Sequence, residues 1–316
     1  MRILYFGSGA FGLPTLQSLV QRHEILGIVT QPDRPAGRGG RLTPTPIAQW
    51  AAEHLPGVPI FKPERVGDAE VVAELRALAG PGRADAWVVI AFGQKLPAAL
   101  LEGVFAINLH ASLLPRWRGA APINAAILAG DAETGNSVIT LADRMDAGLI
   151  LAQSRRAIGP LTTAGELHDQ LAADGPALVE QVLMDHARGT LSGRPQDESQ
   201  VTIAPKLTKS AGEIDLNHPA DFLRRQVHAM TPWPGATVMF QGNPLKLLRV
   251  EQVPTPQPTG EPGTLADVRH GVVICGRGTA LRLIEVQPAG KRPMSWADFA
   301  RGRRIEPGSR MTPAGA

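Results

Sequence analysis

The sequence is almost without cysteine. Its 316 residues include one, Cys275, which can neither form a disulfide within the chain nor supply a cysteine-rich metal site. No run of about 18 apolar residues occurs, so no transmembrane helix is expected. The first seven residues reach a glycine before the apolar run of a signal peptide could form. These absences predict a soluble, cytoplasmic protein.

Common signatures of covalent and metal-dependent catalysis are also missing. There is no G-x-S-x-G nucleophile elbow, no H-E-x-x-H pair and no cluster of cysteine and histidine. We therefore expect no metal, and any transfer reaction is expected to pass directly to an incoming nucleophile without an enzyme-bound intermediate.

Charge is spread unevenly along the chain. The formal net charge is +3, and residues 209–316 hold 14 Lys and Arg against 9 Asp and Glu. A basic C-terminal part beside a mildly acidic N-terminal part suggests that the C-terminal part meets a polyanion. An ordinary solvated surface explains an excess of this size equally well.

The N-terminal part alternates short apolar runs with helix-like segments. Strands are predicted at 3–6, 25–30, 87–92, 105–109 and 137–141, and helices at 13–21 and 163–188. Thr163 and Glu166 have the spacing of a capping box, which marks a helix start. This alternation predicts an α/β fold with a doubly wound, mostly parallel sheet over residues 1–189.

The pattern changes near residue 190. Residues 190–208 are polar and without periodicity, which is typical of a linker. One helix-like segment at 219–230 is followed by short β-type runs at 237–240, 245–250, 271–275 and 281–286. Regular short strands predict a small β-barrel domain over 209–316.

A glycine-rich turn near the N-terminus is also compatible with a dinucleotide-binding protein. Gly7, Gly9 and Gly12 match G-x-G-x-x-G after a strand and before a helix, and Asp33 follows at the spacing of a ribose-binding acid. An NAD-dependent oxidoreductase is therefore an alternative. We favour a structural turn, because Asp33 lies beyond the tip of the second strand and a basic loop follows it.

Two polar side chains on one strand face form the strongest chemical signal. Asn108 and His110 lie two residues apart in an apolar strand, so they share a face at its carboxyl end, where parallel sheets bind ligands. An amide can stabilise a developing oxyanion, and an imidazole can move a proton near neutral pH. Asp146, after the 137–141 strand, supplies a carboxylate. A structural histidine is the alternative.

The residues around this strand resemble a known family. Asn108-x-His110 followed by Ser112-Leu113-Leu114-Pro115, together with Asp146-x-Gly148, is similar to the signature of the folate-dependent formyltransferases. The resemblance implies that Asn108, His110 and Asp146 are catalytic. It also implies a folate pocket lined by Phe92, Gly93, Ser112, Leu113, Leu114 and Pro115. Ala111 and Phe92 depart from the residues common in the family.

Longer stretches resemble the branch of this family that acts on tRNA. These are residues 30–39, Pro232-Trp233-Pro234 and residues 283–291. The resemblance implies 10-formyltetrahydrofolate as donor, an aminoacylated initiator tRNA as acceptor, an OB-like C-terminal domain and a monomer. The implied tRNA contacts are Arg34, Arg38, Arg41, Lys206 and Lys209. The alternatives are a formyltransferase acting on an amino-sugar nucleotide and a non-catalytic tRNA-binding protein.

Overall fold

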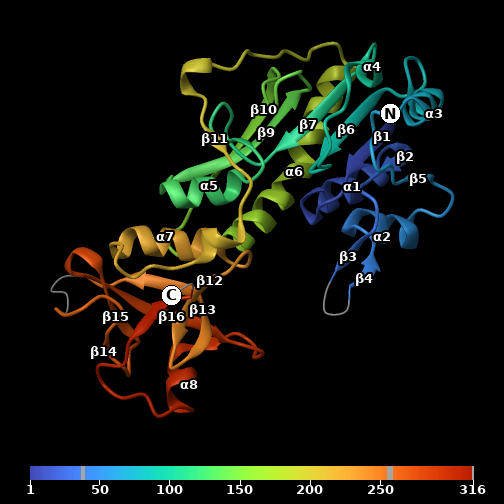
Figure 1. The fold of residues 1–316 in the computed structure, drawn as a ribbon. Coiled ribbons are helices and arrows are strands. Elements are labelled where there is room, and N and C mark those ends of the chain that lie inside the picture. The colour runs from blue at the N-terminus through green and yellow to red at the C-terminus, as the bar shows by residue number, and fades with distance from the viewer. Residues whose placement is uncertain (37–39, 255–258, 315–316) are drawn as a thin grey trace. The chain divides into compact units, whose positions relative to one another are not determined.

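The computed structural model describes residues 1–36, 40–254 and 259–314 (Figure 1). The contacts divide the chain into two compact units, which are described separately. The sheet unit holds residues 1–118, 135–156 and 168–202, and the barrel unit holds residues 119–134, 157–167 and 203–316. The barrel unit thus takes segments from both sides of the expected 190–208 linker, whereas the last segment of the sheet unit ends within it, at Thr202. The expected limits at 189 and 209 remain a prediction.

The sheet unit is built on a seven-stranded sheet with the order β10-β9-β7-β6-β1-β2-β5. Its strands are β1 (Arg2–Gly7), β2 (Glu24–Val29), β5 (Ile60–Phe61), β6 (Ala86–Ile90), β7 (Ala106–His110), β9 (Glu133–Thr140) and β10 (Ile150–Ala157). Strands β5, β2, β1, β6 and β7 pair in parallel, and β9 joins β7 antiparallel. The doubly wound, mostly parallel sheet is confirmed.

Helices cover both faces of this sheet. They are α1 (Leu13–Val20), α2 (Pro46–His54), α3 (Ala69–Ala79), α4 (Ala98–Leu101) and α6 (Ala164–Ala187). On one face, Leu75 of α3 lies in a buried cluster with Leu4 and Trp87, and the Trp87 indole donates to the Ala79 carbonyl at 2.8 Å. On the other face, α6 approaches so closely at Gly175 that an added Cβ would lie 2.8 Å from Leu109 of β7.

The glycine-rich turn after β1 packs against a buried tyrosine. An added Cβ at Gly12 would lie 2.2 Å from the Tyr5 hydroxyl, and one at Gly7 would lie 2.6 Å from the Tyr5 ring. The Tyr5 hydroxyl also donates to the Gly12 carbonyl at 2.8 Å. Asp33 accepts from Lys62 Nζ at 2.6 Å. Packing against Tyr5 therefore accounts for two of the glycines, as the structural interpretation of this turn expects.

The barrel unit contains a seven-stranded antiparallel sheet that curls on itself. The strand order is β14 (Leu265–Asp267), β15 (Val272–Cys275), β16 (Thr279–Pro288), β13 (Asn243–Gln252), β12 (Ala236–Phe240) and β18 (Met311–Pro313), and β17 (Met294–Ser295) pairs with β16. The two edges meet, because Leu265 N donates to Ser309 O at 2.9 Å and Met311 N donates to Gly263 O at 2.8 Å. The expected small barrel is confirmed.

Helices α5 (Pro122–Ala129), α7 (Ala220–Met230) and α8 (Trp296–Arg301) belong to this unit. Asn124 of α5 donates from Nδ2 to the Ala229 carbonyl of α7 at 2.6 Å. The capping box expected at Thr163 is present, since Glu166 Oε2 accepts from Thr163 N at 2.9 Å and Glu166 N donates to Thr163 Oγ1 at 3.3 Å.

Two short strand pairs complete the secondary structure. Strands β3 (Arg34–Ala36) and β4 (Arg41–Thr43) form an antiparallel hairpin in the sheet unit. Strands β8 (Arg118–Gly119) and β11 (Ile203–Ala204) form the other pair. Among the described residues, no helix is both long enough and apolar enough to cross a bilayer.

Candidate active site

Asn108 and His110 lie on one face at the carboxyl end of β7. Asn108 pairs with Val89 of β6 and with Ile139 of β9, so it occupies the middle of the sheet. Leu109 points to the opposite face, toward Gly175 of α6. The alternation of a strand therefore places the two polar side chains together, where neighbouring parallel strands end.

The imidazole of His110 is buried and held at both nitrogens. Its ring is 7% exposed, and Nε2 lies 2.8 Å from the Trp117 carbonyl oxygen. A carbonyl oxygen only accepts, so Nε2 carries a proton and donates it. The other nitrogen, Nδ1, lies 3.6 Å from Oδ2 of Asp146. The ring is thus oriented by a backbone carbonyl, with Nδ1 facing the Asp146 carboxylate.

Asp146 lies in a tight turn after β9. Its side chain is 15% exposed, and its backbone has a φ of +53°, in the left-handed region that non-glycine residues rarely adopt. Two residues later, a Cβ at Gly148 would lie 1.7 Å from the Thr140 carbonyl oxygen, so the close approach requires glycine there. The turn therefore brings a carboxylate from β9 to the histidine of β7.

The Asn108 amide completes this arrangement. The side chain is half-buried and makes no hydrogen bond to another described residue. A half-buried amide without a protein partner is available to a ligand. The structure therefore brings Asn108, His110 and Asp146 together near the carboxyl end of β7.

The loop after β7 is fixed by buried hydrogen bonds. The Ser112 hydroxyl donates to the Arg116 carbonyl at 2.7 Å, and Ser137 Oγ donates to the Ser112 carbonyl at 2.6 Å. Ser137 Oγ in turn accepts from Leu114 N at 3.1 Å. Ser112 and Leu114 are buried, whereas Leu113 and Pro115 are half-buried. Of these four side chains, the last two are the more accessible to a ligand.

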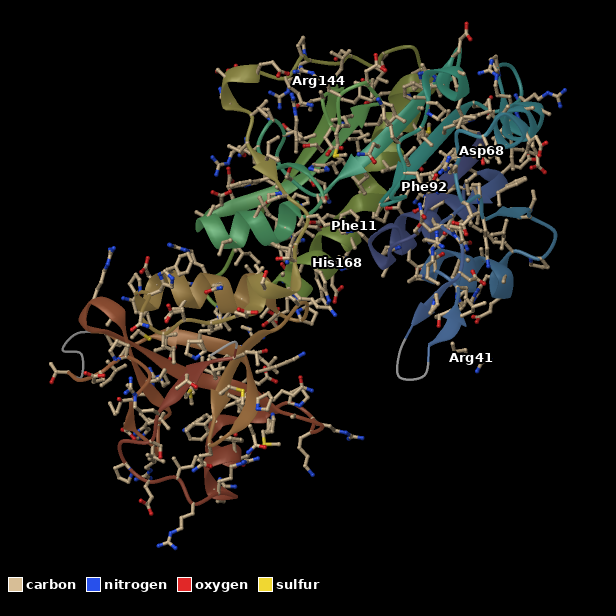
Figure 2. The ribbon with its side chains drawn as sticks, viewed as in Figure 1. Phe11, Arg41, Asp68, Phe92, Arg144 and His168 are labelled. Carbon is tan, nitrogen blue, oxygen red and sulfur yellow. The ribbon has the colours of Figure 1, made fainter. Side chains whose placement is uncertain are left out.

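Phe92 and Gly93 follow the carboxyl end of β6, the parallel neighbour of β7. The Phe92 ring is buried in the core, edge-on to Phe6 with 5.5 Å between ring centroids, and Figure 2 labels it. The Phe92 carbonyl accepts from Ser8 Oγ at 3.0 Å and from Gln31 Nε2 at 3.1 Å. Gly93 has a φ of +88°, which favours glycine. This turn contributes backbone atoms rather than an exposed ring.

The sequence reasoning missed a group of supporting residues in the expected linker. Gln196 Nε2 lies 2.7 Å from the Asp146 carbonyl oxygen, and its Oε1 lies 2.9 Å from Arg118 Nε. Thr202 Oγ1 accepts from Trp117 N at 2.9 Å. The segment lacks periodicity and acts through backbone atoms, so no sequence pattern identified it.

The residues expected to contact tRNA are exposed where they are described. Arg34 and Arg41 lie on the β3–β4 hairpin, and Figure 2 shows Arg41 there. Arg34 Nη2 forms an exposed ion pair with Glu64 at 2.6 Å. Lys206 and Lys209 are exposed in the barrel unit. Arg38 lies outside the described residues.

Potential metal ligands do not gather in the described part of the chain. Over residues 1–36, 40–254 and 259–314, no group of three or more His, Cys, Asp or Glu side chains is placed to hold a metal ion. Cys275 is buried in the barrel unit, and burial raises the pKa of its thiol to about 12. The thiol therefore stays protonated at neutral pH and is a poor nucleophile.

Comparison with known proteins matches the whole length of this chain. Residues 1–183 match the formyl transferase family, and residues 206–304 match the formyl transferase C-terminal domain. The methionyl-tRNA formyltransferase of Symbiobacterium thermophilum is 42% identical, covering 99% of this chain and 96% of that protein. The methionyl-tRNA formyltransferase of Methylococcus capsulatus is 44% identical, covering 95% of this chain and 96% of that protein.

Solved structures share the fold at lower identity. HypX from Aquifex aeolicus, in complex with tetrahydrofolic acid, aligns with a TM-score of 0.63 and 17% identity over 97% of this chain and 49% of that chain. An N-formyltransferase from Helicobacter canadensis, in complex with folinic acid and dTDP-3-aminofucose, aligns with a TM-score of 0.65 and 14% identity over 91% of this chain and 99% of that chain. On its full-length matches, the chain belongs to the methionyl-tRNA formyltransferase family.

Proposed function

We propose that this protein transfers the formyl group of 10-formyltetrahydrofolate to the free α-amine of methionyl-initiator tRNA. The product is N-formylmethionyl-tRNA for translation initiation, a cytoplasmic process. The observation that carries the proposal is the Asn108 amide, which has no hydrogen bond to another described residue, on the strand face of the His110–Asp146 pair, in a chain with full-length relatives of that name. All three side chains come from the sheet unit, so one chain supplies the site and a monomer suffices.

Asn108 and His110 act on the formyl oxygen. As the amine nitrogen bonds to the formyl carbon, that oxygen gains negative charge. A fixed N–H aimed at the developing charge stabilises it strongly when water is excluded. The Asn108 amide supplies such a donor, and protonated His110 supplies a second from Nδ1, because its Nε2 is engaged by the Trp117 carbonyl.

Asp146 orients the His110 imidazole and takes part in proton transfer. Its Oδ2 lies 3.6 Å from His110 Nδ1 and so faces the edge of the imidazole. The attacking amine loses a proton as the carbon–nitrogen bond forms, and the departing folate nitrogen takes one as its bond to the formyl carbon breaks. Asp146, with His110 and a water, carries that proton between the two nitrogens.

The folate supplies the formyl group in an activated form. The chain's own residues fit a flat ring system at this edge of the sheet. Gly93 adds no side chain to the turn at φ +88°, and Leu113 and Pro115 offer half-buried apolar surface. The 112–115 loop is fixed by Ser137, so it presents these surfaces without a reordering cost.

The tRNA is recognised mainly through its phosphates. Arg34 and Arg41 on the hairpin, together with Lys206 and Lys209, offer exposed cations to the acceptor end and backbone. Arginine also stacks on unpaired bases, which the single-stranded acceptor end provides. The excess of basic residues over 209–316 adds a diffuse attraction.

A transfer assay tests the proposal and its main alternative. Labelled 10-formyltetrahydrofolate is mixed with the protein and either methionyl-tRNA or an amino-sugar nucleotide. We expect label in methionyl-tRNA alone. Label in the sugar alone would keep the catalytic trio and overturn the tRNA acceptor, and release of free formate without transfer would indicate a hydrolase.

A further inference from the structure

We propose that Gln196 is a positioning residue that holds the Asp146 turn in its reactive geometry. Its Nε2 donates to the Asp146 carbonyl at 2.7 Å and to the Gly148 carbonyl at 2.9 Å. One amide group therefore spans the turn on both sides of Ala147. A residue at φ +53° stays there only where its surroundings enforce it. The proposal rests on the catalytic role proposed for Asp146.

The orientation of the Gln196 amide is fixed by its other end. Oε1 of Gln196 accepts from Arg118 Nε at 2.9 Å. Two carbonyl oxygens need donors and a guanidinium needs an acceptor, so only one orientation of the amide satisfies all three. Gln196 is thus a fixed double donor toward the Asp146 turn.

Arg118 is itself anchored rather than free to move. It is buried, and its Nη2 pairs with Glu198 Oε1 at 2.9 Å. The same Glu198 oxygen lies 2.9 Å from Nη2 of Arg144, which Figure 2 labels and which precedes Asp146 by two residues. The Arg118 guanidinium holds the pKa of Glu198 below its ordinary value, so the carboxylate is charged at neutral pH. A second link thus ties the segment to the Asp146 turn.

The same segment also supports His110. Thr202 Oγ1 accepts from Trp117 N at 2.9 Å, and Thr202 O accepts from Arg118 N at 2.9 Å. These bonds fix the peptide whose carbonyl receives the His110 proton at 2.8 Å. Gln196, Glu198 and Thr202 therefore hold both partners of the His110–Asp146 pair. Geometry at the level of 1 Å decides rate, and a misplacement of that size can cost about 100-fold.

Two substitutions separate the effect of the Gln196 N–H donors, which bind the Asp146 turn, from the effect of its oxygen, which accepts from Arg118. Gln196→Glu keeps an acceptor for Arg118 but removes the N–H groups that hold Asp146 and Gly148. Gln196→Met keeps the length and removes both functions. Gln200→Met is the matched control, because Gln200 lies on the same segment and donates to Asp197 at 2.8 Å instead.

The experiment measures kcat, KM and backbone amide hydrogen exchange over residues 143–149 in the full-length protein. We expect Gln196→Glu and Gln196→Met to lower kcat about 10- to 100-fold. KM for both substrates should stay within threefold, and exchange over 143–149 should be several times faster. Gln200→Met should match the wild type in all three. A purely structural residue would lower the melting temperature without this local, kcat-specific pattern.

Three results would overturn the proposal. The first is wild-type kcat in Gln196→Glu, which would show that only the contact with Arg118 matters. The second is a loss of kcat with unchanged exchange over 143–149. The third is faster exchange with unchanged kcat. The exchange data are independent of activity, so they report on the turn even if Asp146 proves dispensable, which would refute the proposed mechanism separately.

Discussion

The Nε2–H group of His110 donates to the backbone carbonyl of Trp117 at 2.8 Å. The neutral ring must therefore carry its proton on Nε2, leaving Nδ1 toward Asp146. Long-range proton–nitrogen NMR spectra of histidine-labelled protein, recorded at a pH where the ring is neutral, should show this tautomer for His110. His54 provides an internal contrast, because its Nδ1 lies 2.9 Å from the Trp50 carbonyl and must carry the proton instead. The Nδ1–H tautomer at His110 would contradict the site as described.

The Asn108 amide is expected to act on the transition state more than on binding. Asn108→Ala removes a donor to the formyl oxygen, and loss of one such donor costs about 100- to 1000-fold in kcat. Because Asn108 has no hydrogen bond to another described residue, the melting temperature should change little. Single-turnover transfer rates and thermal melts check this. A rise in KM at unchanged kcat would instead make Asn108 a binding residue.

The hairpin arginines are expected to contribute to tRNA affinity through phosphate contacts. Arg34→Ala combined with Arg41→Ala should weaken tRNA binding about tenfold at low salt. It should also reduce the slope of log Kd against log salt by about one to two. The exposed ion pair of Arg34 with Glu64 contributes little stability, so folding should be unaffected. Arg83→Ala, an exposed arginine of the same unit, is the control. An unchanged salt slope in the double variant would remove the hairpin from the tRNA interface.

The buried histidine of the barrel unit should make stability fall in acid. His228 is 1% exposed and accepts from Val250 N at 3.2 Å. Burial, reinforced by the nearby Arg224 and Arg249 cations, lowers its pKa from 6.5 to about 4. The folded protein then binds fewer protons than the unfolded chain at this position. The contribution of His228 is therefore intact above about pH 6.5 and is lost as the pH falls toward about 4.

A matched variant isolates this contribution. From pH 7.5 to pH 5, the charging penalty of His228 should lower the free energy of unfolding by about 2 kcal/mol. His228→Gln keeps an acceptor for Val250 N and cannot titrate. Denaturant unfolding of both proteins at the two pH values should show a smaller loss in the variant by about that amount. Equal losses would show that His228 does not carry the effect.

The periodicity of apolar residues predicted many of the strands of the sheet and of the barrel. The apolar run of β6 marked a strand buried on both faces, and the Asn108–His110 spacing placed both side chains on one face of β7. Helix α5, in contrast, is apolar nearly all round (residues 122–129) and offers no amphipathic face to identify. Its packing against α7 includes an amide contact, from Asn124 Nδ2 to Ala229 O, that no periodicity encodes.

The residues that support the active site could not be predicted from the sequence, for a different reason. Gln196 and Thr202 act on backbone carbonyls and amides of residues 48 to 85 positions away. Backbone groups are identical in every residue, so the sequence carries no mark of which ones will be bound. The same polar, aperiodic composition fits a free linker and a segment bound along the surface of a domain.

The most direct test of the proposed mechanism is the single-turnover rate of formyl transfer to methionyl-tRNA in Asp146→Asn. Asparagine keeps the size of the side chain but removes the charge beside His110 Nδ1. We expect the rate to fall at least about 100-fold, with KM within threefold and the melting temperature within a few degrees of the wild type. A rate within twofold of the wild type would contradict the catalytic role of the His110–Asp146 pair.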